Sequence, residues 1–222
     1  MTTRYFKNRA EAGRLIAEEL KGYEKQHCAV VALSPGAVLV GAQIAMQLHA
    51  SLAVLMTEQI TLPGELEPLA AITSDNTFTY NNKFSAGEIE AMHSEYLGVI
   101  ESQRIEKLHK LHVLLGKDGE VRRELLNRHT VIVVSDGLQN GMSLDIAQDF
   151  LKPVHIEKLV IVTPIASVHA VDKMHLIGDG LVCLSVPADY MNTDHYYEDN
   201  VVPDAEGIFK IISSLPVHWD RM

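Results

Sequence analysis

The chain has 222 residues, which is enough for one α/β domain with a sizeable core. Its 47% hydrophobic content fits a soluble globular protein, and its formal net charge of -10 argues against a nucleic-acid binder, which would need clustered Lys and Arg. The N-terminus lacks an apolar signal core, and no apolar run approaches the ~18 residues that span a bilayer. We therefore expect a cytoplasmic protein with no membrane segment and, from two cysteines in apolar runs, no disulfide.

The first quarter of the chain predicts a helix and then a β-loop-α-β unit. A capping residue, Asn8, precedes an amphipathic helix, and residues 28–33 form an apolar run typical of a buried strand. A turn at 34–37 leads into a helix over about 38–48, and a second apolar strand follows at 52–56. This order predicts two parallel strands joined by a right-handed crossover.

Residues 58–120 predict an insertion within a single domain that spans 1–222. The segments AAIT and TFTY flank Ser74-Asp75-Asn76, which is typical of a turn between two short antiparallel strands. A capping box of Ser85 and Glu88 then opens an amphipathic helix of roughly 28 residues. Residues 117–119 are expected to close that helix.

The segment 131–143, VIVVSDGLQNGMS, organises the second half of the chain. Four β-branched residues at 131–134 predict a strand buried on both faces of a parallel sheet. A loop with Asp136, Gly137 and Gly141 follows, and then a helix. Loop N–H groups and a helix N-terminus together can hold a phosphate, and glycine allows close approach of the backbone.

The remaining pattern completes a doubly wound sheet of about five mainly parallel strands. Apolar runs at 159–163 and 181–186 predict two more strands, and Asp204 begins a last helix. Such sheets bind ligands beyond the carboxyl ends of their strands. The loops 34–37, 57–67 and 135–143 leave those ends, so we expect them to share a ligand.

The order of these segments resembles that of the type I phosphoribosyltransferases over most of the chain. The resemblance is carried by RYFKNRAEAGRLIAEEL, VVALSPGAVLVGAQIA, PGELEPLAAI, VIVVSDGLQNGMS and LVCLSVPADY with YYED. In the family, segments of this kind form the first helix, the pyrophosphate loop, a Pro-Gly-x-x-Glu segment, the phosphoribosyl pyrophosphate loop, and the last strand with its hood. The fold that this implies is a phosphoribosyltransferase-like α/β domain.

The resemblance also implies a chemistry and a set of residues. Family members bind phosphoribosyl pyrophosphate with Mg²⁺, and a nitrogen nucleophile displaces pyrophosphate. Asp136 would be the catalytic acid that holds the ribose and a ligand of the metal, for which Glu58 is the alternative. The 5-phosphate would lie on a run of seven residues: Gly137, Leu138, Gln139, Asn140, Gly141, Met142 and Ser143.

Two further groups and an assembly follow from the same resemblance. The pyrophosphate loop would be the turn before the second helix, and the base side would be formed by the tail after the last strand. The family's habit of dimerising predicts a homodimer. The residues concerned are Ser34, Pro35, Gly36 and Ala37 for pyrophosphate, and Asp189 and Tyr190 for the base.

Departures from the family pattern favour ligand binding without transfer. Ser135 stands where the first of two acids is expected, the 34–37 turn has no arginine, and residues 56–59 have no basic pair. Cations stabilise a departing pyrophosphate, so their loss weakens the case for catalysis. We therefore expect a binder of a phosphosugar or nucleotide. The alternatives are an active transferase, and a scaffold or dimerisation protein that uses the helix 85–115, with Asp136 and the loop glycines serving only the turn.

Overall fold

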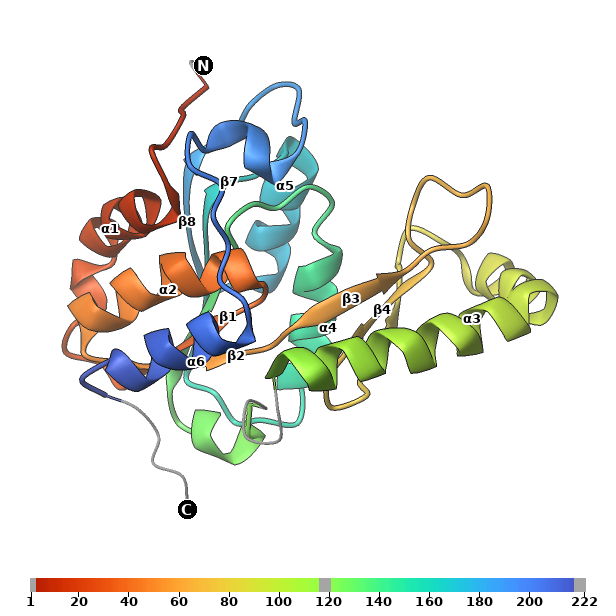
Figure 1. The fold of residues 1–222 in the computed structure, drawn as a ribbon, viewed down its shortest axis with the longest axis horizontal. Coiled ribbons are helices and arrows are strands. Elements are labelled where there is room, and N and C mark those ends of the chain that lie inside the picture. Colours follow the sequence, from red (N-terminus) through yellow and green to blue (C-terminus); the bar gives the residue numbers. More distant parts are fainter. Residues whose placement is uncertain (1–2, 116–120, 218–222) are drawn as a thin grey trace.

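The computed structural model describes residues 3–115 and 121–217, and its centre is a five-stranded parallel sheet (Figure 1). The strands follow the order β2-β1-β6-β7-β8, and every neighbouring pair is parallel. The fold class predicted from the sequence is thereby confirmed. The strand bounds are β1 Cys28–Ala32, β2 Ser51–Val54, β6 Thr130–Val134, β7 Lys158–Ile165 and β8 Gly180–Ser185.

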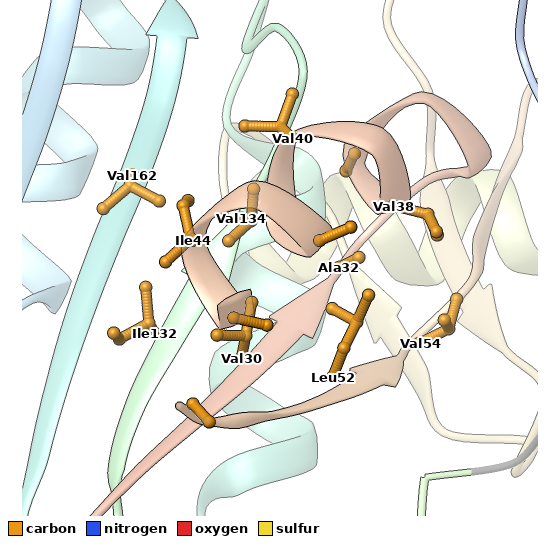
Figure 2. Packing of buried hydrophobic residues seen from close by; sticks show 14 of the residues in the cluster. Val30, Ala32, Val38, Val40, Ile44, Leu52, Val54, Ile132, Val134 and Val162 are labelled. Carbon is orange, nitrogen blue, oxygen red and sulfur yellow. The ribbon is translucent and has the colours of Figure 1, made fainter. Parts of the chain in front are cut away.

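Helices cover both faces of this sheet because its central strands are apolar on both sides. Alternate residues of β1 and β6 enter two separate cores: Val30 and Ile132 face one, whereas Val31 and Val133 face the other. Figure 2 shows Val40 and Ile44 of a helix packed over the first of these faces. The helices on that face are α1 Arg9–Glu19, α2 Pro35–Leu48 and α6 Ala205–Ser214, and those on the other are α4 Met142–Leu151 and α5 Val168–Ile177.

A second sheet lies between β2 and β6 in sequence and extends away from the parallel sheet (Figure 1). Its strands β3 Thr57–Ile60, β4 Ala70–Thr73 and β5 Phe78–Tyr80 are antiparallel, and α3 Ala86–Leu115 packs against it. The predicted hairpin is therefore present. The bounds 58–120 of the proposed insertion stay a prediction, and the expected stop at 117–119 lies outside the described residues.

Two local predictions were wrong, both at the ends of strands. Residues 57–60 were expected to be loop but form β3, because pairing with the apolar strand β4 overrides a polar local sequence. Helix α2 begins at Pro35 and not at 38. Proline suits the first helical position, and Ser34 caps the helix by accepting a 3.0 Å hydrogen bond from the Ala37 N–H.

The capping box predicted from the sequence correctly marks the start of helix α3. The helix spans 30 residues, and its capping box is formed, with the Ser85 N–H donating to Glu88 at 2.7 Å. It has a kink at Tyr96, where φ is -111° and ψ is 20°.

No helix in the ranges 3–115 and 121–217 is both long and apolar enough to cross a membrane.

The strand order places a topological switch point between β1 and β6. The chain runs outward from β1 to β2 on one side, and from β6 to β7 and β8 on the other. Connections from the two strands therefore diverge to opposite faces, which opens a crevice at their carboxyl ends. Ser34 and Asp136 lie just beyond the ends of β1 and β6 at this edge. Short 3-10 helices complete the fold at Lys21–Tyr23, Arg123–Leu126 and Thr193–Tyr196.

Candidate functional site

The carboxylate of Asp136 joins the ends of β1 and β6. Its Oδ1 accepts a 2.6 Å hydrogen bond from the Ser34 hydroxyl, and its Oδ2 accepts a 2.7 Å bond from Arg9 Nε. Gly36 is in close contact, because a Cβ there would lie 2.0 Å from Asp136 Oδ2. The structure thus brings the 34–37 turn and the 135–143 loop together.

The third predicted loop contributes no residue to this contact. Glu58 lies in β3 and forms ion pairs with Lys107, at 3.7 Å, and with Lys110. Both lysines belong to α3. The carboxylate named as the alternative metal ligand is therefore engaged by the long helix.

Arg9 is the central residue that the sequence analysis missed. Its side chain is 3% exposed, and its Nη2 donates to Asp194 Oδ1 at 2.6 Å. Its guanidinium lies 4.5 Å from the centroid of the Tyr197 ring, and the Tyr197 hydroxyl donates to the backbone oxygen of Asp136 at 2.6 Å. Arg9 thus ties α1, the loop after β6 and the tail after β8 into one polar cluster.

A signal for Arg9 was present in the sequence. Arg9, Ala12 and Ile16 are spaced by three and four residues, which places them on one face of α1, and all three are buried. A charged residue on an otherwise apolar face needs a buried partner. Asp136, at the end of a buried strand, was the candidate for that partner.

The Asp136 carboxylate does not fit a direct Mg²⁺ ligand in this arrangement. Its Oδ2 is paired with the Arg9 guanidinium at 2.7 Å, and this fixed positive charge repels a cation. No group of three His, Cys, Asp or Glu side chains in the described ranges is arranged to hold a metal. A Mg²⁺ ion would therefore need water and ligand phosphates for most of its coordination. The metal stays a prediction.

The loop 137–143 is anchored to the strand and helix beside it. The Leu138 N–H donates to Ile165 O at 3.0 Å, and the Ser167 N–H donates to Leu138 O at 2.9 Å. Gly141 is the N-cap residue of α4 with φ of 73°, a left-handed conformation that suits glycine. The Met142 N–H donates a hydrogen bond to Asn140 Oδ1 at 3.1 Å. The loop therefore leads into α4 with a defined backbone path.

Four backbone N–H groups of this loop have no acceptor within residues 3–115 and 121–217. Those of Gln139, Asn140, Gly141 and Ser143 donate to no residue that the structure describes. They lie at and just before the start of α4, where the helix dipole also favours negative charge. Such a set of donors is what an anion-binding loop requires.

The tail after β8 covers the start of this loop. The Tyr190 hydroxyl and Thr193 Oγ1 form a 2.8 Å hydrogen bond, and a Cβ on Gly137 would lie 2.6 Å from each of these oxygens. Only glycine fits there without a shift. Burial raises the pKa of Tyr190 to about 12. Tyr190, predicted on the base side, thus lies next to the predicted phosphate loop.

Asp189, the other residue predicted on the base side, is more exposed than its neighbour Tyr190. Its side chain is exposed, and its backbone oxygen accepts a 3.3 Å hydrogen bond from the Tyr196 hydroxyl. No hydrogen bond or ion pair joins Asp189 to the described residues of the loop after β6. Its role on the base side stays a prediction.

Comparison with known proteins supports the resemblance found in the sequence. No protein-family model matches the chain. Two proteins from Mycobacterium tuberculosis strains CDC 1551 and H37Rv, each named "Putative phosphoribosyl transferase", are 27% identical over 205 residues. The match covers 89% of this chain and 45% of each relative. The chain thus spans less than half the length of the curated relatives it matches.

One solved structure shares the fold, and a second is reported for comparison. The crystal structure of TT1426 from Thermus thermophilus covers 95% of this chain and 99% of its own, with a TM-score of 0.70 and 23% identity. A purine phosphoribosyltransferase from Pyrococcus horikoshii covers 90% of this chain and 98% of its own, with a TM-score of 0.47 and 12% identity. The predicted resemblance to the type I phosphoribosyltransferases is confirmed by the named relatives, and the Thermus structure agrees in fold.

Proposed function

We propose, from this resemblance to the type I phosphoribosyltransferases, that the chain binds the ribose 5-phosphate part of phosphoribosyl pyrophosphate or of a nucleotide. The phosphate would lie on the loop 137–143. The observation that carries the proposal is the set of four N–H groups at the start of α4 for which the described part of the chain provides no acceptor. Backbone donors that point from one loop and helix N-terminus, and that no described protein group accepts from, favour an anion with several acceptor oxygens.

Binding without transfer fits the charges around the switch point. The turn 34–37 contains no basic residue, and the neighbouring Arg9 is shared between the carboxylates of Asp136 and Asp194. One guanidinium against two carboxylates leaves the cluster with a net charge of -1. Such a cluster does not favour a highly charged pyrophosphate group.

Asp136 could still contact a ribose within this proposal. Each carboxylate oxygen has two lone pairs, and each uses one of them here, so a ribose hydroxyl can donate to the other. The role of Asp136 as a catalytic acid stays a prediction. So do the homodimer and the cytoplasmic location.

Active transfer is the second candidate, and the position of Arg9 favours it. A Cβ on Gly36 would lie 2.6 Å from Arg9 Nε, so the guanidinium touches the first turn of α2. The family's pyrophosphate loop stands at this point in the chain. If a ligand displaced Asp194, Arg9 would offer a cation from α1 in place of the missing loop arginine.

The test is calorimetric titration with ribose 5-phosphate, adenosine monophosphate and phosphoribosyl pyrophosphate, the last with and without Mg²⁺. Binding of ribose 5-phosphate supports the proposal, and tight Mg²⁺-dependent binding of the pyrophosphate favours the transferase. If none of the three binds, the proposal fails and the scaffold remains.

Ser143 offers a matched pair of variants for locating the ligand. Ser143→Pro removes one of the unpaired N–H groups, and proline is tolerated in the first turn of a helix. Ser143→Ala keeps that N–H and removes only the hydroxyl. We expect Ser143→Pro to weaken ribose 5-phosphate by about tenfold and to exceed the effect of Ser143→Ala. Equal affinities for both variants and the wild type would place the phosphate elsewhere.

A further inference from the structure

The side chain of Lys173 crosses the phosphate-loop residue Gly141. Lys173 lies on α5, and a Cβ on Gly141 would lie 2.9 Å from its Cδ and 3.5 Å from its Cγ. Only 16% of the lysine side chain is exposed. Its methylene groups therefore pack on the loop backbone next to the unpaired N–H groups.

Two groups from other parts of the chain hold the Lys173 ammonium. It forms an ion pair with Asp145 and donates to Asn82 Oδ1 at 3.3 Å. Asp145 is in the first turn of α4 with a side chain that is 10% exposed, and Asn82 follows β5 of the second sheet. Burial raises the pKa of Asp145. The ammonium is thus fixed close to the start of α4 by contacts from α4, α5 and the second sheet.

The charges at the start of α4 suggest what Lys173 does there: a bound phosphate would need a positive charge beside it. Lys173 and Asp145 together are neutral, and the loop N–H groups carry only partial charges. A bound phosphate would bring up to two negative charges to the same helix turn. Arg9, the cation at the other end of the loop, is engaged by Asp136 and Asp194.

We propose that Lys173 is the cation that binds the ligand's phosphate on the loop 137–143, and that Asp145 and Asn82 hold its ammonium beside the loop before the ligand arrives. The inference rests on the proposed function and names a residue that selects phosphorylated ligands. It predicts that the phosphate shares or replaces the Asp145 carboxylate on the Lys173 ammonium.

The experiment is calorimetric titration of ribose 5-phosphate into the wild type, Lys173→Met and Lys173→Arg, each at low and high salt. Methionine keeps a stem that can pack on Gly141 and removes the charge. We expect Lys173→Met to bind about tenfold more weakly and with less dependence on salt, and Lys173→Arg to retain most of the affinity. A purely structural lysine would leave the salt dependence unchanged, and that result would overturn the inference.

Lys152→Met is the matched control. Lys152 also pairs with an aspartate of α4, Asp149, but it lies at the far end of that helix and is 68% exposed. We expect its affinity for ribose 5-phosphate to equal that of the wild type. An equal loss in both lysine variants would point to a general field effect and would also overturn the inference.

The possible failures can be told apart. If the wild type binds none of the three ligands, the proposed function fails and this inference falls with it. If the wild type binds and Lys173→Met binds equally well, only the inference fails. Because Lys173→Met leaves Asp145 buried without its partner, the double variant Lys173→Met/Asp145→Asn removes both charges and repeats the test if the single variant does not fold.

Discussion

Arg9 and Asp136 form an ion pair across 127 positions of sequence, with 2.7 Å between Nε and Oδ2. Their side chains are 3% and 11% exposed. A buried charge without a partner is costly, and apart from Asp136 the charged partner of Arg9 that the structure describes is Asp194, whose side chain is mostly exposed. The pair therefore fastens α1 to the end of β6 at the edge where the candidate ligand loop begins.

Breaking this pair from one side should destabilise the protein. We expect Asp136→Ala to lower the free energy of unfolding by about 3 kcal/mol, because it leaves the buried Arg9 guanidinium beside a cavity with the exposed Asp194 as its remaining carboxylate partner. Urea denaturation measures the change. The exposed pair of Lys210 and Glu206 on α6 provides the control, since Glu206→Gln should change stability little. A wild-type midpoint for Asp136→Ala would mean that the pair contributes nothing to the fold.

Gly36→Ala should disturb the same pair from the other side. The added methyl would lie 2.0 Å from Asp136 Oδ2 and 2.6 Å from Arg9 Nε, so the carboxylate must leave its donors. We expect a loss of about 2 kcal/mol in unfolding free energy. Gly98→Ala in α3 is the matched change, because nothing lies within 4 Å of its Cβ position, and it should stabilise by about 0.5–1 kcal/mol. Similar effects of both variants would contradict the close packing at Gly36.

The parallel sheet could be predicted from the sequence because its central strands are short, continuous apolar runs. The apolar runs of β1 and β6 identify buried parallel strands at any position in a chain. Strand β3, TEQI, has no such signal, and it becomes a strand only because β4 pairs with it. The start of α2 was misplaced because Ser34-Pro35 reads both as a loop and as a helix cap.

The sequence predicted the loop of the candidate site and the carboxylate of Asp136, but it did not predict the cations beside them. The glycines of the 137–143 loop follow from the local sequence, whereas the cap at Ser34 was missed because α2 was expected to begin at about 38. The pairing of Arg9 with Asp136, and that of Lys173 with Asp145, depend on which helices the topology brings together. The spacing of Arg9 with Ala12 and Ile16 marks Arg9 as a buried charge, but the spacing alone does not show that its partner lies 127 residues away.

Gly137→Ala should open the contact between the loop and the tail. Its methyl would lie 2.6 Å from both the Tyr190 hydroxyl and Thr193 Oγ1, which form a hydrogen bond with each other. We expect a loss of about 1–2 kcal/mol, measured by urea denaturation. In the background of Thr193→Ala the same change should cost less, because one of the two obstructing oxygens is gone. Strictly additive effects of the two substitutions would contradict a direct contact.

The buried phenol of Tyr190 predicts a loss of stability at alkaline pH. Burial raises its pKa from 10.0 to about 12 in the folded protein, and the nearby Asp136 carboxylate acts in the same direction. The unfolded chain therefore ionises first, so the stability that depends on the neutral phenol is complete below pH 10 and is lost between pH 10 and 12. Phenylalanine cannot ionise, so Tyr190→Phe should lose less stability than the wild type over this range. Urea denaturation at several pH values measures the difference, and parallel curves for the two proteins would show that the phenol of Tyr190 ionises as readily in the folded protein as in the unfolded chain.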